Sequence, residues 1–286
     1  MTIRPRRSAL YMPGTNAKAL EKARTLPCDA VILDLEDAVA PSAKAQAREQ
    51  VMAAVVARAF GAREVIVRIN GLGSEWGSDD LEAAAKAHPD GVLVPKVEQP
   101  TDLETIGARL GADIPLWAMI ETPRAVINVH AIAAETSLAG LVMGTNDLAK
   151  ETRARLTAGR AAMLPWLTQA VLAARACGID ILDGVYNALA DADGFRAECE
   201  QSRDLGFDGK TLVHPSQIAP CNAVFSPTPE EIEDARRIIA VFDLPENRDR
   251  GVVGLDGRMV ERMHADMARR TVALAEGIAA LEPAHP

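Results

Sequence analysis

The sequence predicts an α/β fold, a (β/α)8 TIM barrel followed by a C-terminal helical extension. Short apolar runs alternate with segments of helical periodicity along most of the chain, and eight such runs are present. The runs are apolar throughout, which is typical of parallel strands covered on both faces. Eight strands that are each followed by a helix form a TIM barrel. A doubly wound sheet is the structural alternative, and the lack of a GxGxxG motif after the first run disfavours it.

The expected strands have short apolar cores and begin within the first ten residues of the chain. They cover residues 8–12, 30–35, 64–69, 91–95, 115–120, 138–143, 179–182 and 210–213. Between them lie Ala-rich segments with apolar residues at helical spacing, such as 44–60 and 161–177. Together these elements predict a catalytic barrel domain over residues 1–225.

The segment after His214 changes character, because four prolines interrupt the repeating pattern within fifteen residues. Thr228 and Glu231 have the spacing of a helix-starting capping box. The expected elements of this part are a helix, a Gly-rich turn and a last Ala-rich helix, at residues 229–242, 250–257 and 260–281. We expect residues 226–286 to form a lid-like extension that lies beside the barrel or reaches a neighbouring subunit.

Composition excludes several classes of protein. The chain has 286 residues, 48% of them apolar, and a net charge of −9 without any basic block, which argues against a nucleic-acid partner. Its four cysteines show no CxxC spacing, as expected in a reducing compartment. No apolar stretch has the length of a membrane span or of a signal-peptide core. We therefore expect a cytoplasmic protein that does not contact a membrane.

Polar residues lie at the end of each expected strand. In chain order they are Tyr11 with Gly14, Glu36 with Asp37, Arg68 with Asn70, Lys96, Glu121, Asn146 with Asp147, Asp183, and His214. The carboxyl ends of all barrel strands meet at one face, where the active sites of this fold are built. The sequence therefore predicts a polar site at that face.

Several of these residues also have local explanations. Glu36 and Asp37 have the positions of helix caps, and Asp183 that of a solvated loop residue. Lys96 is expected to pair with a neighbouring carboxylate, and His214, which precedes a proline, is expected to have a structural role. The charges at Arg68, Glu121 and Asp147 directly follow apolar runs, where an unpaired charge is costly to bury, so they are the strongest candidates for function.

Glu121 and Asp147 follow successive strands and have no His or Cys cluster near them in the sequence. Two carboxylates form an oxygen-donor site for a hard cation such as Mg²⁺, with positions left open for water and substrate oxygens. A cation held in this way polarises the oxygen of an α-keto or α-hydroxy carboxylate. Arg68 adds a bidentate hydrogen-bond donor for a substrate carboxylate or a developing alkoxide.

Seven ordered motifs extend these observations along nearly the whole chain. They are RSALYMPG, DAVILDLEDAV, VRIN, VLVPKVE, AMIETPRAV, GTNDLA and GFDGKTLVHPSQI. In this order they resemble the citrate lyase β-subunit-like family of the HpcH/HpaI aldolase superfamily, which also contains malyl-CoA and citramalyl-CoA lyases. The resemblance implies Mg²⁺ as cofactor, held by Glu121 and Asp147, and Arg68 as the substrate-binding arginine.

The resemblance also implies where coenzyme A binds. Tyr11, Lys18 and Lys22 match positions that contact the thioester in relatives, and the two lysines are spaced to share one helix face. Val213 and His214 match positions that border the ligand in some relatives.

One position departs from the family pattern. Many relatives carry an aspartate in the C-terminal extension that reaches a neighbour's site as acid or base, and Glu261 stands at that position here. Glutamate has the same chemistry with a longer reach, so we expect Glu261 to keep a catalytic role. Family members form ring-like homo-oligomers, often trimers, and the resemblance implies the same assembly for this chain.

The resemblance implies a Mg²⁺-dependent carbon–carbon lyase. It would cleave or form a 3-hydroxyacyl-CoA such as citramalyl-, malyl- or citryl-CoA, with acetyl-CoA and a small keto acid as products. One alternative is an aldolase acting on free hydroxy-keto acids without CoA, through the metal or through a Schiff base at Lys96. Another is a dependent β subunit of a citrate lyase complex that uses an acyl-carrier protein.

Overall fold

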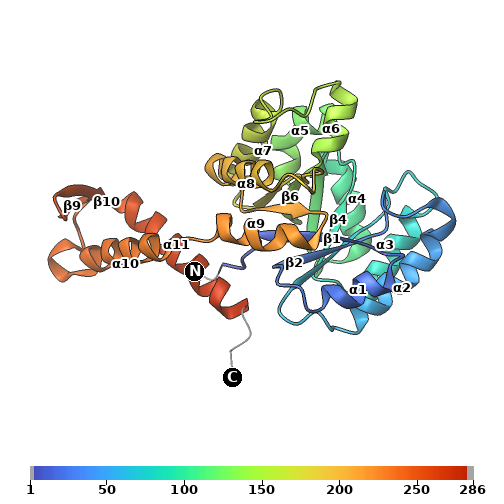
Figure 1. Ribbon diagram of the computed structural model, residues 1–286, viewed down its shortest axis with the longest axis horizontal. Helices are drawn as coiled ribbons and strands as arrows, with labels where there is room; N and C mark the ends of the chain where they lie inside the picture. The colour runs from blue at the N-terminus through green and yellow to red at the C-terminus, as the bar shows by residue number, and fades with distance from the viewer. Residues whose placement is uncertain (1–2, 282–286) are drawn as a thin grey trace. The chain divides into compact units, whose positions relative to one another are not determined.

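A closed barrel of eight parallel strands is the main feature of this computed structural model, which describes residues 3–281 (Figure 1). The strands pair in chain order and are β1 (Ser8–Pro13), β2 (Ala30–Asp34), β3 (Glu64–Arg68), β4 (Gly91–Val94), β5 (Leu116–Ile120), β6 (Leu138–Met143), β7 (Asp180–Asp183) and β8 (Gly209–Leu212). Strand β1 pairs with both β2 and β8, which closes the barrel. The predicted fold class is confirmed, and every strand begins and ends within two residues of its predicted bounds.

Helices follow the strands and surround the barrel (Figure 1). They are α1 (Ala17–Ala23), α2 (Lys44–Val56), α3 (Gly77–Ala87), α4 (Pro100–Leu110), α5 (Pro123–Ala133), α6 (Thr145–Thr152), α7 (Leu164–Cys177), α8 (Ala192–Leu205) and α9 (Ile218–Phe225). The predicted helices over 44–60 and 161–177 are α2 and α7, both shorter than expected. Helix α2 ends before Arg58, whose positive φ of 50° does not continue a helix, and Pro165 fixes the first turn of α7.

Strand residues alternate between two cores, as the two-residue period of a strand requires. The inner core fills the barrel with Ala9, Ala30, Ile32, Ile66, Leu93, Trp117, Met119, Val142 and Leu182. Their neighbours in the sequence, such as Val65 and Val67, belong to the outer core between strands and helices. The parity of a strand position therefore decides whether its side chain enters the barrel.

Arg6 closes the amino-terminal end of the barrel. Its guanidinium pairs with Glu64 at the start of β3 and with Asp180 at the start of β7, and lies 5.0 Å from the ring centroid of Trp117 on β5. The side chain is 16% exposed. One guanidinium thus ties together three strands below the inner core.

Residues 3–5 and 226–281 group into a second compact unit, distinct from Arg6–Phe225. It contains α10 (Pro229–Asp243), the hairpin strands β9 (Val252–Leu255) and β10 (Arg258–Glu261), and α11 (Arg262–Leu281). The predicted capping box starts α10, because Glu231 N–H donates to Thr228 Oγ1 at 3.2 Å and Thr228 N–H to Glu231 Oε2 at 2.7 Å. A small core forms around Phe242, Val253, Val260 and Ala265.

The turn predicted over residues 250–257 is confined to Asp256 and Gly257, because residues 252–255 form the first strand of an antiparallel hairpin. Asp256 and Gly257 both have positive φ, 51° and 77°, as required at the centre of a two-residue hairpin turn. Helix α11 consequently begins at Arg262, two residues later than predicted. A scan of residues 3–281 finds no helix that is long and apolar enough to cross a membrane.

Candidate active site

The carboxyl end of the barrel carries a cluster of charged side chains that includes Asp34, Arg68 and Glu121. Asp34 continues the inward-facing series of Ala30 and Ile32, and Arg68 that of Ile66. Glu121 similarly follows Trp117 and Met119 at two-residue spacing, one position beyond β5. Strand parity therefore turns all three side chains into the mouth of the barrel.

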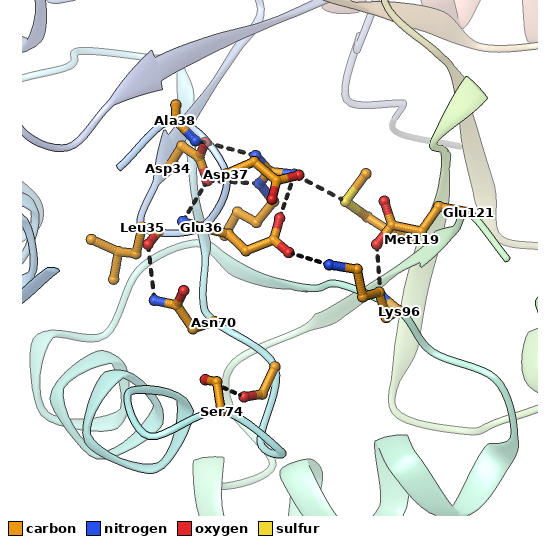
Figure 2. Close-up of polar contacts among 12 residues, drawn as sticks. Asp34, Leu35, Glu36, Asp37, Ala38, Asn70, Ser74, Lys96, Met119 and Glu121 are labelled. Atoms are coloured by element: carbon orange, nitrogen blue, oxygen red, sulfur yellow. Dashed lines mark hydrogen bonds and ion pairs between the residues drawn. The ribbon is translucent and has the colours of Figure 1, made fainter. Parts of the chain in front are cut away.

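Arg68 is held from several sides. Its Nε and Nη2 each donate to one oxygen of Asp34 at 2.7 Å, Nη1 pairs with Glu36 Oε2 at 2.8 Å, and the Tyr11 ring centroid lies 5.0 Å away. Burial opposes the charge, but the hydrogen bonds to Asp34 raise the pKa of Arg68 well above its usual value. Arg68 is therefore a fixed cation at the site. Figure 2 shows Asp34 at the end of β2, Glu36 in the loop that follows it and Met119 of β5 directed toward one another.

Asp34 is a site residue that the sequence analysis missed. It pairs with Arg68 across the β2–β3 register, and its carboxylate also accepts the Glu36 and Ala38 N–H groups at 2.9 Å and 3.2 Å. Asp34 lies inside the apolar run predicted as a strand over residues 30–35, and the site residues expected there were Glu36 and Asp37 at its end. A carboxylate inside an otherwise apolar run was the signal for it.

Glu121 is 1% exposed and its two oxygens differ. Oε1 accepts the Lys96 N–H at 2.7 Å, whereas Oε2 is buried without a hydrogen-bond partner among the described residues. Burial raises the pKa of Glu121 to about 7, and the negative charge of Glu36 adds to the shift. An orphaned carboxylate oxygen of this kind is what a cation would satisfy.

The loop after β6 brings Asp147 toward Glu121. A Cβ atom added to Gly144 would lie 2.3 Å from Glu121 Cβ and 2.8 Å from its Oε2, so only glycine permits this approach. Asp147 lies in the first turn of α6, half-buried, and its charge contributes to the raised pKa of Glu121. The two predicted metal ligands thus belong to one site.

The donor set fits a hard cation. Residues 3–281 contain no cluster of three or more His, Cys, Asp or Glu side chains suited to a metal. Two carboxylates, Glu121 and Asp147, would leave the remaining positions of a cation to other oxygen ligands, an arrangement that Mg²⁺ usually adopts. The unpartnered Glu121 Oε2 and the glycine at position 144 support this fit.

A pocket of about 340 Å³ opens over this site. Tyr11, Asp37, Arg68, Asp147 and Val213 are the predicted site residues that line it. Val213 is 41% exposed, and Tyr11 Oη lies 3.9 Å from the sulfur of Met119, which also faces the pocket.

Other predicted site residues lie outside that lining. Lys18 and Lys22 are exposed on α1, which directly follows the Tyr11 strand. His214 Nδ1 lies 2.7 Å from Ser216 Oγ and accepts the Ser216 N–H at 3.2 Å, which caps a 3-10 turn as its predicted structural role requires. A ligand contact by His214, Lys18 or Lys22 stays a prediction.

Glu36 and Lys96 complete the group. Glu36 is 6% exposed and contacts both Arg68 and Lys96, so it is a member of the site rather than a helix cap. The ion pair predicted for Lys96 is present, with Nζ 3.0 Å from Glu36 Oε1 (Figure 2). Asp37 lies at the rim with an exposed side chain, 3.9 Å from Arg68 Nη1. We call Asp34, Glu36, Arg68, Lys96 and Glu121 the rim cluster.

The ammonium of Lys96 stays protonated. Burial alone would lower the pKa of Lys96, but the hydrogen bond to Glu36 and the charges of Glu36 and Asp37 offset this and raise it. A Schiff base requires a neutral amine, so the pairing disfavours the Schiff-base variant.

Lys44 is a second residue that the sequence analysis missed. Its buried Nζ donates to the backbone oxygens of Leu35 and Glu36 at 2.8 Å and 2.7 Å, and to Asn70 Oδ1 at 2.7 Å. It therefore holds the turn that carries Glu36 against the end of β3.

Asp183 belongs to a different group, which corrects the expectation that every strand-end residue enters one mouth. It follows inward-facing Leu182, so its side chain points outward, where it pairs with Lys210 and Arg160 at 2.8 Å. Lys210 also pairs with Glu198 at 2.7 Å. We call Asp183, Lys210, Arg160 and Glu198 the outer cluster.

Glu261 lies at the end of β10, in the second compact unit. Its side chain is exposed, and its backbone N–H donates to His264 Nδ1 at 2.9 Å. The catalytic role expected for its carboxylate stays a prediction.

Comparison with known proteins supports these observations. The model of the HpcH/HpaI aldolase/citrate lyase family matches residues 7–215. The chain is 53% identical over 276 residues to a (3S)-malyl-CoA thioesterase of Cereibacter sphaeroides, covering 96% of each chain. It is 34% identical over 284 residues to the citrate lyase subunit beta of Escherichia coli, covering 96% of this chain and 94% of that one.

Solved structures show the same relationship. CitE from Mycobacterium tuberculosis, in complex with magnesium, acetoacetate and coenzyme A, superposes with a TM-score of 0.77 at 28% identity, covering 95% of this chain and 98% of that one. A citrate lyase from Burkholderia xenovorans reaches a TM-score of 0.83 at 19% identity, over 98% and 97% of the two chains, and shows the fold alone. On the family match and the identities together, this chain belongs to the HpcH/HpaI aldolase/citrate lyase family.

Proposed function

We propose that this protein is a Mg²⁺-dependent lyase that cleaves a small 3-hydroxyacyl-CoA of the malyl-CoA class into acetyl-CoA and an α-keto acid. The observation that carries the proposal is the buried Glu121 Oε2, which has no hydrogen-bond partner among the described residues and lies close to the pocket lined by Asp147 and Arg68. Mg²⁺ held by Glu121 and Asp147 would act as a Lewis acid that polarises the substrate's hydroxyl or keto oxygen. The named relatives, a malyl-CoA thioesterase and a citrate lyase subunit, support a CoA-linked substrate.

The charge of the pocket favours a keto acid with one carboxylate. Arg68 is the only cationic side chain among the described residues that line the 340 Å³ pocket, and Asp34 and Glu36 already pair with it. A second substrate carboxylate would meet Asp37 instead of a cation. Glyoxylate or pyruvate therefore fits the site better than oxaloacetate, which places malyl- and citramalyl-CoA ahead of citryl-CoA.

Asp37, Arg68 and Glu261 are assigned separate steps of the reaction. Asp37 is the most exposed carboxylate of the pocket and lies near Arg68, so we assign to it removal of the substrate's hydroxyl proton. The carbon–carbon bond then breaks, the hydroxyl carbon becomes the keto group, and acetyl-CoA leaves as its enolate. Arg68 stabilises the negative oxygen. Protonation of the enolate carbon, which gives the acetyl group, is assigned to Glu261 of a neighbouring subunit, as the family resemblance implies.

Hydrolysis of the thioester is a second candidate activity at the same site. The 53% identity to a malyl-CoA thioesterase over 96% of both chains favours it. The two activities give different products from malyl-CoA, acetyl-CoA and glyoxylate in one case, malate and free CoA in the other.

The test is incubation of the purified protein with malyl-, citramalyl- and citryl-CoA, each with Mg²⁺ or with EDTA. We expect Mg²⁺-dependent release of acetyl-CoA with glyoxylate or pyruvate. Malate and free CoA without glyoxylate would assign hydrolysis instead. Turnover only with an acyl-carrier protein would select the citrate lyase subunit, and no turnover of any thioester would contradict the proposal.

Lys18 and Lys22 separate a CoA-dependent enzyme from an aldolase for free acids. Replacing both with alanine removes two exposed charges from α1, and the KM for the thioester should rise about tenfold at unchanged kcat. Lys86→Ala, an exposed lysine on α3, is the matched control. A free-acid aldolase would retain its KM in the double variant.

A further inference from the structure

Lys96 contacts a predicted metal ligand through its backbone. It follows β4 with a positive φ of 52°, a left-handed conformation that residues with a Cβ rarely adopt. In this conformation its N–H donates to Glu121 Oε1 at 2.7 Å, while Oε2 of the same carboxylate stays without a hydrogen bond. The unusual backbone thus fixes which oxygen of Glu121 is left for a cation.

The side chain of Lys96 contacts the other half of the rim cluster. Its Nζ donates to Glu36 Oε1 at 3.0 Å, and Glu36 Oε2 pairs with Arg68 Nη1 at 2.8 Å (Figure 2). Glu36 is 6% exposed, and the turn that carries it is held by Lys44. A single residue therefore connects the carboxylate of Glu121 with the guanidinium of Arg68.

A second cavity shows why Glu36 needs this partner. The cavity has a volume of about 920 Å³, is lined by Glu36, Asp37 and Lys96, and shares Asp37 with the 340 Å³ pocket. The Glu36–Lys96 pair thus borders open space on the side away from Arg68. Without the ammonium, the Glu36 carboxylate has room to turn into the cavity, away from Arg68.

We propose that Lys96 is a positioning residue that sets the distance between the metal ligand Glu121 and the substrate-binding Arg68. The backbone of Lys96 orients Glu121, and its ammonium holds Glu36 against Arg68. This inference rests on the proposed function, because it assigns the two ends of the connection to metal and substrate. The side chain therefore affects the chemical step more than Mg²⁺ binding, which depends on the backbone contact.

Three variants separate the two contacts. Lys96→Met removes the charge at similar length, Lys96→Arg keeps it, and Lys96→Gly keeps the left-handed backbone without a side chain. We expect Lys96→Met and Lys96→Gly to lower kcat about 30-fold, with KM and the calorimetric Mg²⁺ dissociation constant within about threefold of wild type. Lys96→Arg should restore kcat to within about fivefold. Lys86→Met, which breaks only the exposed pair with Glu82, should change nothing.

A double-mutant cycle tests whether Lys96 acts through Glu36. Glu36→Gln should lower kcat by a similar factor, and the Lys96→Met/Glu36→Gln variant should be no slower than the slower single variant. If the kcat losses of the two single variants multiply in the double variant, Lys96 does not act through Glu36. An unchanged kcat in Lys96→Met would overturn the proposal as well. Loss of Mg²⁺ binding in Lys96→Met but not in Lys96→Gly would overturn the assignment of the metal contact to the backbone.

Calorimetry and thermal unfolding of the same variants need no turnover. If the wild type binds Mg²⁺ but cleaves no thioester, the proposed function fails. The link between Lys96 and Glu36 is then tested by Mg²⁺ affinity and by whether Lys96→Met and Glu36→Gln lower the unfolding temperature additively. Additive shifts contradict the connection, and less than additive shifts support it.

Discussion

Two buried charge clusters in the same barrel differ in their balance of charge. The outer cluster pairs two acids, Asp183 and Glu198, with two bases, Lys210 and Arg160. The rim cluster sets three acids against the two bases Arg68 and Lys96. Including the neighbours Asp37, Asp147 and Lys44 leaves five acids against three bases. Only the rim cluster has surplus negative charge.

The pKa values of two equally buried carboxyls report this difference. Asp183 is 0% exposed and Glu121 1% exposed. Burial would raise the pKa of Asp183, but Lys210 and Arg160 lower it to about 2. Burial raises the pKa of Glu121 to about 7, with Glu36 adding to the rise. Removing one partner from a charge-balanced buried cluster destabilises the fold, whereas a cluster with surplus negative charge is suited to bind a cation.

The largest expected effect comes from the rim cluster. Glu121→Gln removes a metal ligand at constant volume, so activity should fall about 10⁴-fold and Mg²⁺ affinity should be lost. The free energy of unfolding without metal should stay the same or rise, because a poorly compensated charge is removed. Kinetics, calorimetry and urea unfolding measure the three quantities. Full Mg²⁺ affinity in this variant would refute the ligand assignment.

The outer cluster should respond in the opposite way. Asp183→Asn leaves Lys210 and Arg160 facing a neutral group, and breaking a buried pair of this kind costs about 3–5 kcal/mol. Urea unfolding gives the loss, and Mg²⁺ affinity under native conditions should not change. The control is Asp204→Asn, which breaks an exposed pair with Arg203 and should cost under about 1 kcal/mol. Equal losses in the two variants would remove the distinction between the clusters.

The next smaller effect is that low pH should reduce the contribution of the outer cluster to the free energy of unfolding. The folded pKa of Asp183, about 2, lies below its ordinary value of 3.8, so its stabilisation is complete above pH 3.8 and is lost as pH falls through 2. The difference corresponds to about 2 kcal/mol. Urea unfolding between pH 5 and pH 2.5 measures most of this loss, and Asp183→Asn should show a correspondingly shallower pH dependence. Parallel curves for the two proteins would contradict the assignment.

The smallest expected effect concerns Gly144. A methyl group there would overlap Glu121 Cβ, so Gly144→Ala should move the carboxylate and weaken Mg²⁺ binding about tenfold, or about 1.4 kcal/mol. Gly73→Ala is the control, because a Cβ at Gly73 meets nothing within 4 Å and its φ is not positive. Calorimetric titration measures both. Equal Mg²⁺ affinity in the two variants would show that Glu121 tolerates displacement.

The barrel was predictable because its strands are apolar throughout and are separated by helical segments. The prediction that Glu121, Asp147 and Arg68 lie in one site is consistent with the structure, whereas their roles stay predictions. The grouping of Asp183 with them was wrong, although strand parity distinguishes the positions. Leu182 faces inward, so Asp183 faces outward, while Asp34 shares the face of Ile32.

Other features depend on tertiary contacts that no local pattern reveals. The left-handed backbone of Lys96 is accompanied by a hydrogen bond from its N–H to Glu121, a residue 25 positions away. The hairpin in the extension is a different case, because Asp256–Gly257 is a strong local turn signal. It was overlooked because the flanking strands contain only four residues each.

The guanidinium of Arg6 has a consequence for how reactants move. The inner core already fills the barrel and Arg6 joins β3 and β7 below it, so no path leads through the barrel to the end opposite the rim cluster. Substrate and products therefore enter and leave on the rim-cluster side of the barrel, and a product that remains bound there blocks the next substrate molecule.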